Sequence, residues 1–75
     1  MSTENKIDLV ISRLKSYELD VINKGIVGLS SQYSITGTLN NKEIKAIVNH
    51  FTNGTINVQG IDQQLVYELI KDIIS

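Results

Sequence analysis

The chain has 75 residues and a net charge of −1, with seven Lys and Arg against eight Asp and Glu. This length fits one small domain over residues 1–75 with a marginal core, because so short a chain hides only about 60% of its unfolded surface. It contains no Cys and one His, which excludes disulfides and leaves no Cys/His cluster for a structural zinc ion.

The N-terminal segment has the apolar spacing of an amphipathic helix, with Ser2 or Thr3 available as the N-cap. Its apolar residues recur at intervals of three and four positions, and Lys6, Lys15 and Glu18 fall outside that stripe. We therefore expect the longest helix of the chain here. The stripe consists of Ile7, Val10, Ile11, Leu14, Tyr17 and Val21.

A weak repeat of seventeen residues follows, in segments that begin at Ile22, Leu39 and Ile56. In each copy an apolar residue precedes an Asn, and a second apolar residue comes four positions after that Asn. This is the spacing of a helix start, in which Asn caps the first turn and the two apolar residues pack together. The repeat therefore predicts a helix start at each Asn. These are Asn23, Asn40 and Asn57.

Apolar spacing inside the last two of these segments also favours helices. Segment 24–35 is weaker, because Gly25, Gly28 and three serines disfavour a helix. Together the segments predict an all-α domain, a small bundle of three or four short helices. The residues with helical spacing are Ile44, Ile47, Val48 and Phe51 in one segment and Ile61, Leu65, Leu69, Ile70 and Ile73 in the next.

An α+β domain is the alternative, with short strands near 17–22, 26–29, 33–39 and 55–58. Apolar residues alternate with polar ones at the start of this region, and Asn23-Lys24-Gly25 can form a hairpin turn. The Tyr, Ile, Thr and Val residues of these segments suit a half-buried pleated sheet. Both interpretations retain a helix over 40–51 and another near the C-terminus.

The sequence contains no clear motif for catalysis, cofactor binding or metal binding. Residues 32–43 match an EF-hand loop at Gly37 and Glu43, but the early ligand positions lack the carboxylates that bind calcium. His50 has no neighbouring residues in the sequence that would make it a general base or a metal ligand. The glycines form no phosphate-binding loop. We therefore expect a protein that is not an enzyme and that uses no cofactor.

A small protein of this kind is expected to act through its surface, as a protein–protein interaction or regulatory protein. The C-terminal helix carries apolar residues on more than one stripe, which is wider than a single contact with a core requires. The partner is expected to be another protein or a second copy of the chain. The candidate interaction surface comprises Tyr17, Tyr67, Val66, Leu69, Ile70 and Ile74.

A nucleic-acid-binding regulator of helix-turn-helix type is the alternative function, in which a helix over 40–51 offers Lys42 and Lys45 to a groove. The basic residues of the chain are spread among acidic ones, so the positive patch of a nucleic-acid-binding protein is missing. This charge distribution does not favour DNA or RNA as the partner.

The N-terminal sequence does not have the pattern of a signal peptide, because Asp8 and Arg13 interrupt its apolar stretch. No apolar run reaches the roughly 18 residues that are needed to span a bilayer. We therefore expect a cytoplasmic protein that does not associate with a membrane.

Overall fold

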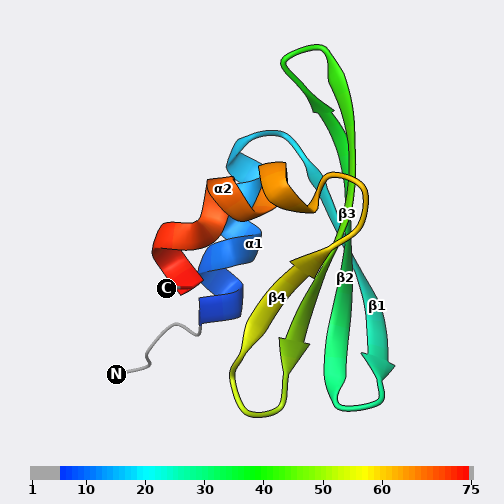
Figure 1. Ribbon diagram of the computed structural model, residues 1–75, viewed down its shortest axis with the longest axis vertical. Coiled ribbons are helices and arrows are strands. Elements are labelled where there is room, and N and C mark those ends of the chain that lie inside the picture. The colour runs from blue at the N-terminus through cyan, green and yellow to red at the C-terminus, as the bar shows by residue number, and fades with distance from the viewer. Residues whose placement is uncertain (1–5, 75) are drawn as a thin grey trace.

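The computed structural model describes residues 6–74, which form two helices and one four-stranded antiparallel sheet (Figure 1). The elements in chain order are α1 (Lys6–Ser16), β1 (Asp20–Val27), β2 (Ser30–Leu39), β3 (Lys42–Phe51), β4 (Ile56–Gln59) and α2 (Gln63–Ile74). Neighbouring strands in the chain are also neighbours in the sheet, in the order β1-β2-β3-β4. This is an α+β fold, so the predicted all-α bundle is wrong.

The two terminal helices lie within the segments with the clearest helical spacing. Contrary to expectation, the N-terminal one is not the longest helix of the described chain, because α1 has 11 residues and α2 has 12, and α1 ends before Val21, which lies in β1. In α1 the residues Ile7, Val10 and Leu14 are buried, as expected for the core face of an amphipathic helix. Its predicted caps, Ser2 and Thr3, lie outside the described residues. The C-terminal helix is confirmed as α2, although it begins six residues after the predicted cap.

The clearest error lies in residues 40–51, which form a turn and the strand β3 instead of a helix. Asn40 and Asn41 have φ angles of 54° and 64°, and they connect Leu39 of β2 directly to Lys42 of β3. Two residues with positive φ are the signature of a type I′ hairpin turn, and Asn tolerates this left-handed conformation better than most residues. Asn40 is therefore a turn residue and not a helix cap.

The other two asparagines of the repeat lie in strands. Asn23 is in β1, where its Oδ1 accepts a hydrogen bond of 2.7 Å from the backbone N–H of Gly25. Asn57 is in β4, where its Oδ1 accepts a hydrogen bond of 3.0 Å from Nδ2 of Asn49. Each side chain thus binds a partner within the sheet, and neither begins a helix.

The alternative interpretation had the correct fold class but different bounds. The tight turn between β1 and β2 lies at Gly28 and Leu29, since Val27 pairs with Ser30, and not at the predicted Asn23-Lys24-Gly25. The alternative also kept a helix over 40–51, where the structure has β3. The strand near 55–58 corresponds to β4.

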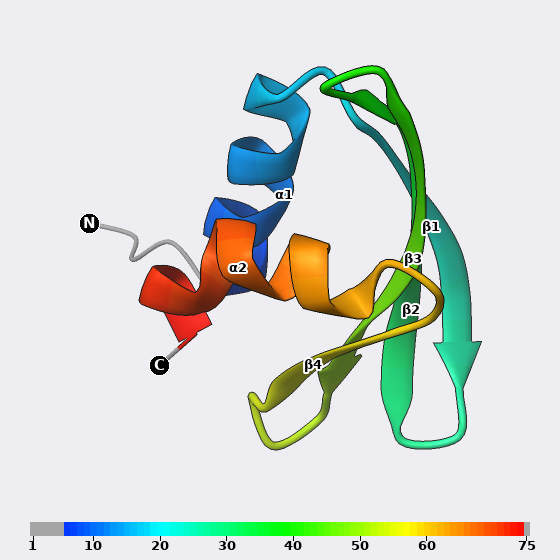
Figure 2. The ribbon, with the colours of Figure 1, turned by 45° about the horizontal axis from the view of Figure 1, so that its top comes forward.

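Both helices cover the same face of the sheet, as Figures 1 and 2 show. Alternate residues of β3 point toward them, so that every second side chain from Ile44 to Val48 is buried. The opposite face of the sheet carries no helix in the described chain. The core comprises Ile7, Val10, Leu14, Leu19, Ile35, Ile44, Ala46, Val48, Ile56, Val66 and Ile70.

The loop before α2 is fixed to the middle of the sheet through the buried residue Asp62. Its Oδ2 accepts a hydrogen bond of 2.8 Å from the backbone N–H of Lys45, and its Oδ1 lies 3.1 Å from Nζ of Lys42. These contacts hold the pKa of the Asp62 carboxyl below its ordinary value, the backbone hydrogen bond contributing most. Asp62 therefore sets where α2 begins relative to β3.

Candidate interaction surface

The predicted residues of α2 lie mostly in the core. Val66 and Ile70 are fully buried, so neither is available to a partner of the folded chain. Leu69 and Ile74 are half-buried and pack against the same core. The broad apolar surface of α2 has a simple physical cause, because this helix packs against both α1 and the sheet. Its two apolar stripes therefore contact the chain itself.

The two tyrosines are the exposed members of the predicted set, and they lie on different elements. Tyr17 follows the end of α1 and is 39% exposed, whereas Tyr67 is on α2 and is 40% exposed. Tyr67 and Ile74 line a shallow hollow beside β4. Leu69 lines a different hollow, together with Leu39 and Leu65. The structure thus brings Tyr67 and Ile74 together and separates them from Tyr17 and Leu69.

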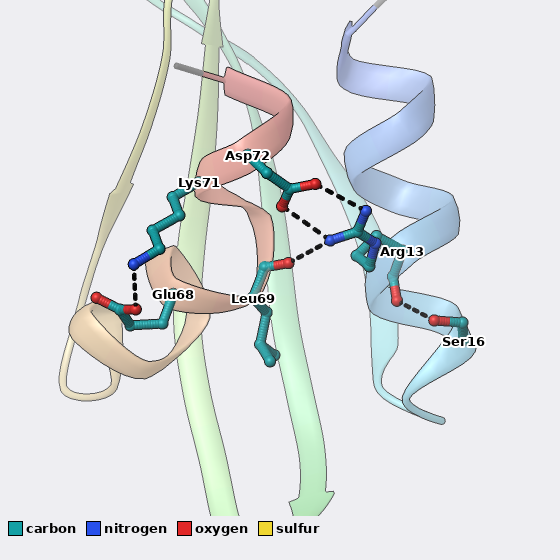
Figure 3. Close-up of polar contacts among 6 residues, drawn as sticks. All are labelled: Arg13, Ser16, Glu68, Leu69, Lys71 and Asp72. Carbon is teal, nitrogen blue, oxygen red and sulfur yellow. Dashed lines mark hydrogen bonds and ion pairs between the residues drawn. The ribbon is translucent and has the colours of Figure 1, made fainter.

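Polar contacts join the two helices (Figure 3). The guanidinium of Arg13 donates two hydrogen bonds to the Asp72 carboxylate, at 2.9 and 3.0 Å, and a third to the backbone carbonyl of Leu69 at 2.8 Å. The bidentate contact raises the pKa of Arg13 and lowers the pKa of Asp72. A second ion pair, Lys71 with Glu68 at 2.8 Å, lies on the outer side of α2. The contacts of Arg13 hold α2 against α1.

A second group of exposed apolar side chains lies along β1 and the hairpin that follows it, at the edge of the sheet. We name this surface the β1 hairpin patch; it comprises Ile22, Ile26, Val27 and Leu29. The side chains of Ile26 and Leu29 are 78% and 73% exposed, and those of Ile22 and Val27 are 53% and 54% exposed. Apart from Val21, every residue of β1 is exposed.

The β1 hairpin patch is exposed because of where β1 lies in the fold. β1 is an edge strand, and only β2 pairs with it in the described chain. An edge strand leaves a row of backbone N–H and C=O groups without a partner strand. The hairpin at Gly28 and Leu29 also extends past the helices, at the lower end of the view in Figure 1. The helices therefore cannot cover its side chains.

A β-bulge divides β1 into two parts. Asn23 pairs with Tyr33 and Gly25 pairs with Gln32, so that Lys24 has no opposite residue on β2. Gly25 has a φ of 93°, a conformation that favours glycine. Residues before the bulge, from Asp20 to Asn23, continue as a regular strand with an open edge.

The residues of the helix-turn-helix alternative are in the sheet. Lys42 and Lys45 belong to β3, and the ammonium group of Lys42 is paired with Asp62. A recognition helix over 40–51 does not exist, because these residues form the turn and β3. The geometry expected for insertion into a DNA groove is therefore absent from the described part of the chain.

His50 lies in β3, where a helix end was expected. It is half-buried and lines a surface depression with Lys6, Asn53 and Thr55. Among residues 6–74 there is no group of three or more His, Cys, Asp or Glu side chains placed to hold a metal ion. No helix in this part of the chain is both long enough and apolar enough to cross a membrane.

The sequence prediction missed the β1 hairpin patch. One signal was present, because Ile26 and Val27 precede Gly28 and Leu29 follows it, in a segment that is poor in helix formers. In a hairpin such residues point to both faces, and two helices can cover only one face. Recognising the hairpin would have placed some of these side chains in solvent.

Comparison with known proteins found no family model, no curated protein and no solved structure that matches this chain.

Proposed function

We propose that this chain is a non-enzymatic protein-binding module whose contact surface is the β1 hairpin patch. One observation carries the proposal: four of the eight large hydrophobic side chains exposed in the described chain lie within residues 22–29. Contiguous exposed apolar groups are a feature of sites that bind another surface. We also propose a cytoplasmic location, since a chain without Cys suits a reducing compartment.

The edge position of β1 defines the mode of binding. An extended segment of a partner can add to an exposed edge as a further strand, with affinity from main-chain hydrogen bonds and specificity from side-chain contacts. Ile22 and Val27 pair with Ser34 and Ser30 of β2, which alternate with the core residue Ile35. Both therefore lie on the face of the sheet that carries no helix. Ile26 lies on the opposite face, so that an added strand would meet apolar side chains on both sides.

The surface proposed here replaces the helical one that the sequence predicted. Two of its members, Val66 and Ile70, already contact the core, and Leu69 and Ile74 are half-buried. The β1 hairpin patch has more exposed apolar side chains and a free strand edge. These two properties together support the sheet edge as the binding surface.

Site-specific photo-crosslinking in the source cells tests the proposal. A photoreactive residue at position 29, where Leu29 is 73% exposed, should give covalent adducts with a bound protein. The matched control is position 9 in α1, where Leu9 is also an exposed leucine at 41%. Adducts from position 29 and few from position 9 are expected. Equal yields at both positions, or no adduct at position 29, would contradict the proposal.

A further inference from the structure

We infer that the β1 edge binds a second copy of this chain, through antiparallel pairing of two β1 strands about a two-fold axis at Ile22. This inference rests on the proposed function, because it names the partner of the same surface. The pairing would join two four-stranded sheets into one continuous eight-stranded sheet, with the β1 strands at its centre.

Charge complementarity along β1 supports this register. When two antiparallel strands place Ile22 opposite its own copy, residue 20 of each strand faces residue 24 of the other. These residues are Asp20 and Lys24, so two-fold symmetry creates two opposite-charge pairs. Both side chains are exposed, and within residues 6–74 neither is in an ion pair. Registers centred on Asp20 or Lys24 would instead place like charges opposite each other.

The apolar residues of β1 fit the same arrangement. Ile22 is 53% exposed and would pack against its own copy at the axis, at the short distance of directly opposed side chains. Because the strands run in opposite directions, Ile26 and Val27 of one protomer would extend past the start of the partner's β1. Tyr17, which is 39% exposed, precedes the start of β1 and offers an apolar ring there. Self-pairing thus covers Ile22 at the axis and brings Ile26 and Val27 beside the chain that precedes the partner's β1.

The bulge limits the association to two copies. With the axis at Ile22, pairing runs from Asp20 to Lys24 and ends there, because the strand bends at the bulge between Asn23 and Gly25. The two β1 edges pair with each other, so that the only free strand edge left in the described part of each protomer is the four-residue β4. A two-fold contact of this kind closes on itself and does not extend into fibres. Since the paired segment is short, the dimer should be weak and should depend on protein concentration.

A charge-swap experiment measured by sedimentation equilibrium tests the inference. The wild-type chain should form dimers, and Asp20→Lys and Lys24→Asp should each weaken self-association by about tenfold or more, because each turns two attractive contacts into two repulsive ones. An equimolar mixture of the two variants should recover heterodimers. In the mixed dimer the lysine introduced at position 20 faces the aspartate introduced at position 24, and the unchanged Lys24 of one variant faces the unchanged Asp20 of the other. Asp8→Lys, an exposed charge reversal in α1, is the control and should leave the dimer unchanged.

Three results would overturn the inference: a wild-type chain that stays monomeric up to about 1 mM, single variants that dimerise as the wild type does, or a mixture that associates no better than either variant. Crosslinking at position 29 separates the two proposals. Adducts with a different protein, combined with a monomeric wild type, would refute the homodimer and leave the binding function standing. The absence of any adduct would refute both.

Discussion

Replacing Asn41 by alanine should lower the free energy of unfolding by about 1 kcal/mol. Asn41 has a φ of 64° in the two-residue turn between β2 and β3, and alanine in the left-handed region is about 1 to 2 kcal/mol less stable than in its preferred conformations. Asparagine in this conformation already has part of that unfavourable free energy, so the expected loss of stability is at the lower end of this range. For a domain of this size, about 1 kcal/mol corresponds to a decrease in Tm of about 4 to 8 °C.

Replacing Asn41 by glycine should have the opposite effect. Asn-Gly is among the preferred pairs for a type I′ turn, and glycine has no steric penalty at positive φ. We expect unchanged or increased stability, with the m-value unaltered, in urea unfolding followed by circular dichroism. If a helix began at Asn40, position 41 would be its first residue, where alanine is a better helix former than asparagine. A gain with alanine and a loss with glycine would therefore refute the hairpin turn.

Three further predictions concern the core and the polar contacts. Ile70→Ala should cost about 2 to 5 kcal/mol because Ile70 is fully buried, whereas Tyr67→Ala should cost about 1 kcal/mol or less; thermal unfolding of both variants distinguishes core from surface. The pKa of Asp62 is lowered in the folded state, so its stabilising contribution is complete above about pH 4 and is lost as the pH falls through the lowered pKa. Urea unfolding at several pH values should show that Asp62→Asn reduces this acid dependence. A double-mutant cycle at Arg13 and Asp72 should give a favourable coupling free energy that decreases when salt is added, and a coupling that is insensitive to salt would contradict the ion pair.

The sequence predicted the two helices because their apolar residues keep intervals of three and four positions along the whole segment. In β3, by contrast, Ile44, Ile47, Val48 and Phe51 fit intervals of three and four, while Ile44, Ala46 and Val48 fit the period of two that the strand uses. Local spacing could not decide between them. The decision depends on pairing with β2 and on the turn at Asn40, which are tertiary features.

The candidate site was predicted less well than the helices, for a related reason. Apolar residues on two stripes of α2 indicated an uncovered surface, but Val66 and Ile70 are covered by other parts of the chain. Conversely, the exposure of Ile26 and Leu29 follows from the edge position of the hairpin. Exposure is a property of the assembled sheet, because the order of the strands decides which strand lies at the edge.

The meander topology has a consequence for the order of folding. Every strand pairs with its neighbour in the chain, so the whole sheet can form from local hairpins, whereas the contact of Arg13 with Asp72 spans 59 positions. Contacts between residues close in the chain form fastest, because their loop-closure entropy is small. During synthesis on the ribosome, α2 emerges after the sheet, and until it docks the sheet lacks one of the two helices that cover its apolar face. The nascent chain should therefore be most prone to aggregation in this interval.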